Sequence, residues 1–213
     1  MAKISPRVLT AIEALGLAGY IAWYIWQLQA ARSNSWIVFP VWLVLSIALH
    51  RDTSKTLGWR ADNLWPATRQ GLAIFAIFIV STCLAGLGFG AYNRIPTRFV
   101  EPWRFSAYLA FCLLQQVALN SYLTNRLLYA FEDPRWAALL AGAIFAGLHW
   151  PNPVLVPLTF VGGTAMSWLF SCERNIIPLT LGQALLGTLV WWVFPVAWHH
   201  GMRVGPGYYS FHP

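Results

Sequence analysis

The stretch that decides the fold reads GLAIFAIFIVSTCLAGLGFGA and occupies residues 71–91. It contains no charged side chain, and as a helix it is long enough to cross the roughly 30 Å hydrocarbon core of a bilayer. A helix on the surface of a soluble domain keeps a polar face, and an apolar helix in its core is usually shorter. We therefore interpret this segment as a membrane-spanning helix.

Six further apolar runs lie on either side of it. They are residues 8–30, 35–50, 105–130, 136–149, 154–171 and 176–198. Prolines at Pro134, Pro151 and Pro153 separate the later runs, because proline cannot donate a backbone hydrogen bond within a helix. The polar stretch 51–70 interleaves tryptophans with basic residues, which is typical of a segment at the headgroup interface. The sequence predicts an all-α, polytopic membrane helix bundle of about seven transmembrane helices, forming a single domain over residues 1–213.

The composition agrees with a membrane location. The chain is 58% hydrophobic and 10% charged, whereas a soluble domain carries about 25% charged residues. Its 14 Lys and Arg outnumber its 7 Asp and Glu, but the basic residues are scattered singly, so we expect no nucleic-acid binding. Cys83, Cys112 and Cys172 have no metal-ligand spacing, which argues against a zinc site or a disulfide framework.

The distribution of Lys and Arg over the loops predicts the orientation, because cytoplasmic loops carry an excess of them. Nine would share the side of the N-terminus: Lys3, Arg7, Arg51, Lys55, Arg60, Arg69, Arg126, Arg135 and Arg174. Five would lie opposite: Arg32, Arg94, Arg98, Arg104 and Arg203. We expect a cytoplasmic N-terminus in a bacterial inner (plasma) membrane.

Polar side chains within the apolar runs are informative, because lipid cannot satisfy their hydrogen bonds. Gln116, Asn120 and Thr124 are spaced i, i+4, i+8 and form one helical stripe, with Gln115 beside it. The stripe either joins helices through hydrogen bonds or lines a wet cavity. With His149 and Gln183 in later runs, a shared polar cavity between the fourth, fifth and seventh spans is expected.

These residues resemble the motifs of the CPBP family of intramembrane proteases, which includes the CAAX-processing and bacteriocin-processing enzymes. The family's Glu-Glu pair and following Arg correspond to Gln115, Gln116 and Asn120, with Arg126-Leu127 downstream. Its Phe-x-x-x-His motif is intact as Phe145 and His149, and its His-x-x-x-Asn/Asp motif corresponds to Gln183 and Gly187. With Leu57-Gly58-Trp59 upstream, the resemblance covers about residues 55–190 and leaves an interfacial tail at 199–213.

The resemblance implies a site in which a glutamate activates water, while histidines and an asparagine orient the water and stabilise the oxyanion. Neutral Gln115 and Gln116 cannot act as that base, and Gln183 replaces an imidazole. We therefore expect a non-catalytic pseudoenzyme, acting as an accessory, assembly or binding subunit of a larger membrane complex. The alternative is a divergent endopeptidase for membrane or prenylated peptides, using His149 with Gln116 and Asn120 as oxyanion donors. A transporter ranks last, because mid-membrane carboxylates are scarce.

Three other residues are considered for chemistry. Glu13 lies within the first run, where pairing with Arg7 near the cytoplasmic end is preferred to a role as a base. His199 and His200 are weak candidates for a metal or haem site, but adjacent helical residues point about 100° apart. No metal and no cofactor are expected. The expected partners are other integral membrane proteins and lipids, with pigments as a further class.

Overall fold

The structure is a computed structural model and describes residues 5–29, 31, 34–90 and 102–211. All regular secondary structure in these residues is helical, as the sequence predicts. Residues 91–101 lie outside the described residues, as do Lys3, Arg32 and His212. Arg94 and Arg98, which also contributed to the predicted orientation, are among them.

In the part of the chain that the structure describes, seven helical segments correspond to the seven predicted runs. They are α1 (Pro6–Trp23) continued by η1 (Tyr24–Leu28), α2 (Val38–His50) preceded by η2 (Asn34–Ile37), α3 (Leu64–Phe89), the continuous helix of α4 (Pro102–Gln116), η5 (Val117–Thr124) and α5 (Asn125–Phe131), α6 (Pro134–Gly147), α7 (Leu155–Glu173) and α8 (Ile176–Val193). Four segments of the described chain are long and apolar enough to cross a membrane: residues 6–28, 64–89, 155–173 and 176–193. The protein is thus an all-helical integral membrane protein.

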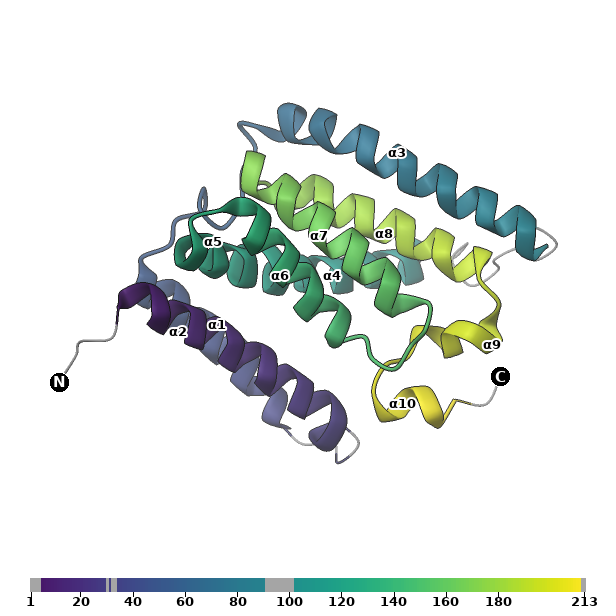
Figure 1. Ribbon diagram of the computed structural model, residues 1–213, viewed down its shortest axis with the longest axis horizontal. Helices are drawn as coiled ribbons and strands as arrows, with labels where there is room; N and C mark the ends of the chain where they lie inside the picture. Colours follow the sequence, from purple (N-terminus) through teal and green to yellow (C-terminus); the bar gives the residue numbers. More distant parts are fainter. Residues whose placement is uncertain (1–4, 30, 32–33, 91–101, 212–213) are drawn as a thin grey trace.

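The helices form a bundle in which the outer segments lie on opposite sides (Figure 1). Helix α3 runs along one side next to α8, and the α1–α2 pair lies along the other, against α5. Between them, α6 and α7 pack side by side, and α4 contacts α8. After α8 the chain continues into the short α9 (Val196–His199), η6 (His200–Met202) and α10 (Pro206–Tyr209) near the C-terminus.

Helix boundaries follow local signals, and the two described below differ most from the predicted limits. Asp133 and Asn175 cap α6 and α8 by accepting hydrogen bonds from the backbone N–H groups two residues later. Helix α3 begins at Leu64 rather than at 71, so the end of the polar stretch is helical. Helix α8 ends at Val193 rather than at 198, because Phe194 is extended ahead of Pro195.

Small residues allow α6 and α7 to approach closely. A β-carbon at Gly142 would lie 2.0 Å from Thr164 Oγ1, and one at Gly163 would lie 3.3 Å from the Gly142 α-carbon. Membrane helices commonly associate through small residues that let their backbones approach closely, because there is no hydrophobic driving force between helices in lipid.

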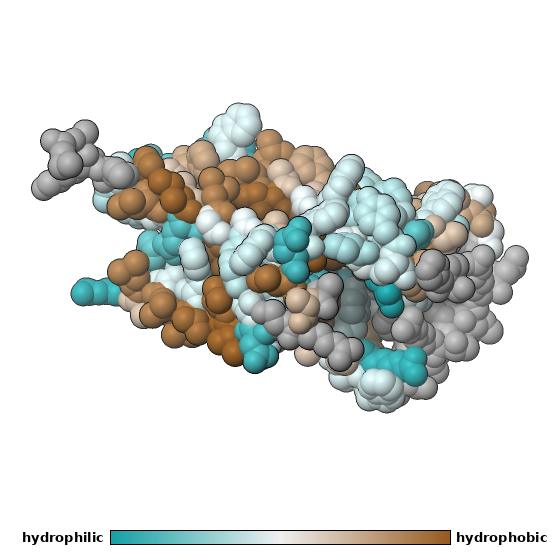
Figure 2. Space-filling model, turned by 90° about the horizontal axis from the view of Figure 1, so that it is seen from below, coloured by the Kyte–Doolittle hydropathy of each residue, from teal (hydrophilic) through white to brown (hydrophobic). Residues whose placement is uncertain are grey.

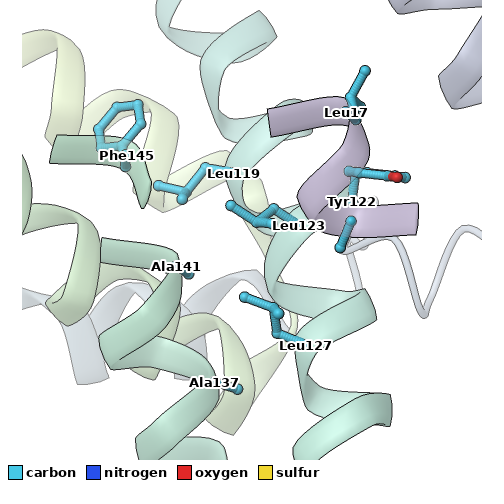
Figure 3. Packing of buried hydrophobic residues seen from close by; sticks show 9 residues of the cluster. Leu17, Leu119, Tyr122, Leu123, Leu127, Ala137, Ala141 and Phe145 are labelled. Atoms are coloured by element: carbon cyan, nitrogen blue, oxygen red, sulfur yellow. The ribbon is translucent and has the colours of Figure 1, made fainter. Parts of the chain in front are cut away.

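The main apolar core lies where α1, η5, α5 and α6 meet (Figure 3). Leu119, Leu123 and Leu127 project from the continuous helix towards Ala137 and Ala141 of α6. The middle of that helix is π-helical, a widened form that often occurs at functional sites. The core therefore fixes the helix on which the polar stripe lies.

The loop 51–63 is attached to the bundle through backbone contacts. Ser121 Oγ donates to Leu57 O at 2.5 Å, and the Ile176 N–H donates to Gly58 O at 3.0 Å. Gly58 has a φ of +81°, and a β-carbon there would lie 2.6 Å from the Phe170 ring. Glycine at this position thus lets the loop pack against the ends of α7 and α8.

Candidate functional site

Three glutamine side chains form the centre of the site. Gln116 Nε2 donates to Gln183 Oε1 at 2.6 Å, and Gln183 Nε2 donates to Gln115 Oε1, also at 2.6 Å. Gln183 of α8 therefore bridges two adjacent residues of α4. The sequence predicted that these positions would meet, because they correspond to the two glutamates and a histidine of the family motifs.

The polar stripe continues this chain of hydrogen bonds into η5. Asn120 Nδ2 donates to Gln116 Oε1 at 2.6 Å, and Thr124 Oγ1 lies 3.1 Å from Asn120 Oδ1 and 2.9 Å from Ser167 Oγ of α7. Gln116, Asn120, Thr124 and Ser167 are fully buried. The stripe thus joins the continuous helix to α7 and α8, in agreement with the interpretation that its side chains form hydrogen bonds between helices.

The direction of these hydrogen bonds limits the chemistry of the stripe. Each buried amide oxygen accepts from the next polar group, and the amide nitrogens of Asn120 and Gln116 donate along the same chain. Such bonds between membrane helices contribute about 0.6–2 kcal/mol each. These amides satisfy one another, and none of them can take a proton near neutral pH.

A cavity of about 210 Å³ lies beside the chain of amides. Its lining comes from α3, α4, α6, α7, α8 and the tail: Phe78, Thr82, Tyr108, Phe111, Gln115, Phe145, His149, Leu155, Leu158, Thr159, Gly162, Gly163, Met166, Gln183, Leu186, Gly187, Val190, Met202 and Val204. No charged residue belongs to this described lining. The expected polar cavity is therefore largely apolar, because Gln116 and Asn120 point into the helix contacts and α7 supplies much of the wall.

His149 and Phe145 keep the arrangement that the Phe-x-x-x-His motif predicts. The His149 ring lies against Phe145 with ring centroids 4.6 Å apart, and Nδ1 lies 2.6 Å from Phe145 O. Because a carbonyl oxygen can only accept, Nδ1 carries the proton and Nε2 retains a lone pair. The cavity thus has one imidazole nitrogen able to accept a hydrogen bond or a proton.

Gly187 corresponds to the last residue of the family's third motif, and a tyrosine occupies the space beside it. A β-carbon at Gly187 would lie 1.8 Å from Tyr108 Oη and 2.9 Å from Tyr108 Cζ. An asparagine or aspartate side chain cannot fit there while Tyr108 keeps this position. The departure from the motif is therefore accommodated by the neighbouring helix.

The two tail histidines have separate environments. His199 is fully buried with its ring 4.9 Å from Trp191, and its Nδ1 accepts from the Met202 N–H at 3.2 Å. Burial lowers the pKa of His199. His200 instead stacks on Tyr208 at 3.9 Å. No group of three His, Cys, Asp or Glu suited to a metal occurs among the residues that the structure describes.

A second polar cluster, which the sequence analysis did not assemble, surrounds Glu13. His50 Nε2 lies 2.8 Å from Glu13 Oε2, Ser46 Oγ donates to Glu13 Oε1, and Arg126 Nε lies 3.7 Å from Glu13 Oε1. Arg126 Nη2 also lies 2.6 Å from Asp52 Oδ2. The expected Glu13–Arg7 pair is wrong. Arg7 pairs instead with Glu132, which is exposed at the C-terminal end of α5.

This cluster joins α1, α2, the loop 51–63 and α5. Its guanidinium and Asp52 are almost fully buried, with side-chain exposures of 4% and 8%. The available sequence signal was the occurrence of Glu13, His50 and Arg126 at the ends of apolar runs. Because ionised groups in apolar surroundings need partners, that occurrence predicts a shared site for them.

Comparison with known proteins finds one family that is similar to the segment carrying the site. Residues 102–189 match the family model described as type II CAAX prenyl endopeptidase Rce1-like. The match runs from α4 into α8 and includes Gln115, Gln116, Asn120, His149 and Gln183, so the resemblance to the CPBP family is confirmed over this segment. No curated protein and no solved structure matches the chain.

Proposed function

From the premise that residues 102–189 carry the Rce1-like segment, we propose that the protein is a non-catalytic member of this CAAX protease family. In this proposal it acts as an accessory or binding subunit of a larger membrane complex. One observation carries the proposal: Gln115, Gln116 and Gln183 hydrogen-bond to one another where the family has its base and imidazole. The side chains that would activate water therefore hold helices together instead.

The lining of the cavity supports this proposal. Hydrolysis of a peptide bond needs a base that activates water and donors that stabilise the oxyanion. The titratable groups in the described lining are His149 and Tyr108. A tyrosine is protonated near neutral pH, which leaves a single imidazole without a carboxylate beside it in that lining.

A divergent endopeptidase is the second candidate, and the tautomer of His149 favours it. Since Nδ1 donates to Phe145 O, Nε2 is able to accept a proton from a water molecule. In this mechanism Gln116 and Asn120 would be the oxyanion donors. Gln116 Nε2 already donates to Gln183 Oε1 and to Met166 Sδ, and Asn120 Nδ2 donates to Gln116 Oε1. Of these two side chains, Asn120 alone keeps an N–H for an oxyanion, so we place this mechanism second.

The partners proposed are other integral membrane proteins, lipids and pigments. Figure 2 shows apolar side chains gathered at the end of the molecule where α1 and α2 lie. Val44, Leu45 and Leu49 of α2 are each more than 60% exposed. We further propose seven membrane spans, a cytoplasmic N-terminus and a bacterial inner membrane. The whole chain, residues 1–213, is proposed to be one domain with a core at 55–190 and an interfacial tail at 199–213.

Purification in a mild detergent tests the proposal. The wild-type protein is expected to bring down other membrane proteins in a fixed ratio and to leave membrane and prenylated peptides uncleaved. A monomer that cleaves such peptides would overturn the proposal. If this cleavage disappeared in His149→Ala and persisted in Gln27→Leu, whose side chain is exposed on η1, the endopeptidase would take its place.

A further inference from the structure

The cavity beside the chain of amides is lined by several hydrogen-bonding groups, and two of them, on Gln115 and His149, are not used by the described helix contacts. Gln115 accepts from Gln183 through Oε1, and its amide nitrogen has no partner among the described hydrogen bonds. His149 donates through Nδ1, and Nε2 likewise has no partner among them. The cavity thus offers the amide N–H groups of Gln115 as donors and the His149 Nε2 as an acceptor, and the Thr82 hydroxyl belongs to the same lining.

The rest of the lining determines what these two groups can bind. Phe78, Leu158 and Leu186 are among the apolar side chains around them, and no charged residue is part of the described lining. Transfer of an ionised headgroup into such surroundings carries a large desolvation penalty unless a counter-charge is present. The ligand class that fits is uncharged and carries both a donor and an acceptor.

We propose that this cavity binds the hydroxyl end of a single-chain, uncharged lipid alcohol. One hydroxyl group donates to His149 Nε2 and accepts from the Gln115 amide, so it satisfies both groups with one atom. A volume of about 210 Å³ is below the usual 300–1,000 Å³ of small-molecule pockets, which suits one chain rather than two. The inference rests on the proposed function, because the same groups would otherwise be engaged in catalysis.

The ligand has a route from the bilayer. Phe111 of α4 lines the cavity, and 53% of its surface is exposed. Met202 and Val204 of the tail also contribute to the wall. Asn152 holds this part of the tail, because its Nδ2 donates to His199 O at 2.8 Å and to Arg203 O at 3.0 Å. The alkyl chain can therefore extend past Phe111 towards lipid, and the tail covers part of the cavity.

Photolabelling in phosphatidylcholine nanodiscs tests the proposal. The probe is a long-chain primary alcohol with a diazirine in its chain, and the labelled residues are mapped by mass spectrometry. Labels are expected on residues of the cavity wall. Unlabelled alcohol should compete at about tenfold lower concentration than its methyl ether, because the ether retains an acceptor for Gln115 but has no proton for His149. The matched fatty acid at neutral pH should compete poorly.

Two variants separate the contacts. In His149→Phe the alcohol and the ether should compete equally, whereas in Gln115→Leu both should weaken by up to about tenfold. Gln27→Leu, the matched control, should leave both unchanged. Labels confined to α1 and α2, or equal competition by alcohol, ether and fatty acid with the wild type, would overturn the inference. Peptide cleavage by the same preparation would instead overturn the proposed function, and alcohol binding is measured independently of it.

Discussion

Gly187 of α8 and Tyr108 of α4 share one space, since a β-carbon on the glycine would lie 1.8 Å from the tyrosine hydroxyl. The contact closes the position at which the family motif has an asparagine or aspartate. It also sets the distance between α4 and α8, the two helices that carry Gln115 and Gln183. The loss of one motif residue and the packing of its neighbour are therefore a single structural feature.

Gly187→Ala is expected to destabilise the protein by about 1–3 kcal/mol, because the added methyl group overpacks a filled site. Thermal unfolding in detergent measures the effect. Gly162→Ala is the matched control, since it also lies in a helix beside the cavity but has no atom within 4 Å of its added β-carbon. Replacing Tyr108 by Leu in the Gly187→Ala background should recover part of the loss. An unchanged unfolding temperature in Gly187→Ala would contradict the close contact.

Gln183→Leu is expected to lower the free energy of unfolding by about 1–3 kcal/mol. The substitution removes the Gln183 oxygen that accepts from Gln116 Nε2 and the Gln183 N–H that donates to Gln115 Oε1. Gln116 is fully buried, so its amide is left without this partner. Chemical unfolding followed by tryptophan fluorescence measures this change. Gln27→Leu should change it little, because that side chain is exposed. Equal stabilities of the two variants would mean that the chain of amides is not a structural element.

Much of the helical fold could be predicted from apolar runs, because the hydrocarbon core of a bilayer requires long apolar helices. The two misplaced boundaries have physical causes. Arg69 and Gln70 made the start of α3 look like loop, although side chains near a helix end can reach the interface. Apolar residues continue past Val193, but the chain turns at Pro195 and the helix ends.

The polar stripe was also predictable, because Gln116 and Asn120 recur at helical spacing. What the spacing could not reveal was the partner of each side chain across the bundle. Arg7 and Glu132 pair although they are 125 residues apart in the chain. Such contacts depend on how the helices are arranged, which the apolar pattern does not specify, so the Glu13 cluster was missed.

Arg126→Ala is expected to destabilise the protein by about 3–5 kcal/mol, because it leaves the carboxylate of Asp52 buried without its counter-charge. Arg7→Ala provides the contrast. Its pair with Glu132 is more than half exposed, and exposed ion pairs contribute about 0–1 kcal/mol. Denaturant unfolding of the two variants measures the difference. Similar losses in both would refute the assignment of Arg126 as the buried centre of the cluster.

We expect the folded tail, residues 199–213, to become less stable at acidic pH. Burial lowers the pKa of His199 below its ordinary value of 6.5, so the folded state favours the neutral ring. The resulting stabilisation is present in full above pH 6.5 and decreases as the pH falls below it, because the unfolded tail binds the proton more readily. Limited proteolysis of the tail at pH 7.5 and at pH 5.5 measures this effect. In His199→Phe the acid-induced increase should be smaller, and an equal increase in both proteins would exclude His199 as its source.

Restoring the two family glutamates should not restore catalysis. In Gln115→Glu with Gln116→Glu, the carboxylate at position 116 would face Gln183 Oε1, where the wild type places a donor. Two acceptors at this distance repel, so the carboxyl group is expected to become protonated or to displace Gln183. Asn120 and Gln183 also remain in place of an arginine and a histidine of the family motifs. We expect a protein of lower stability with no cleavage of prenylated peptides, measured by mass spectrometry of the products. Cleavage that appears in this variant and disappears on adding His149→Ala would contradict this expectation. It would show that the two glutamines alone prevent peptide cleavage at the site.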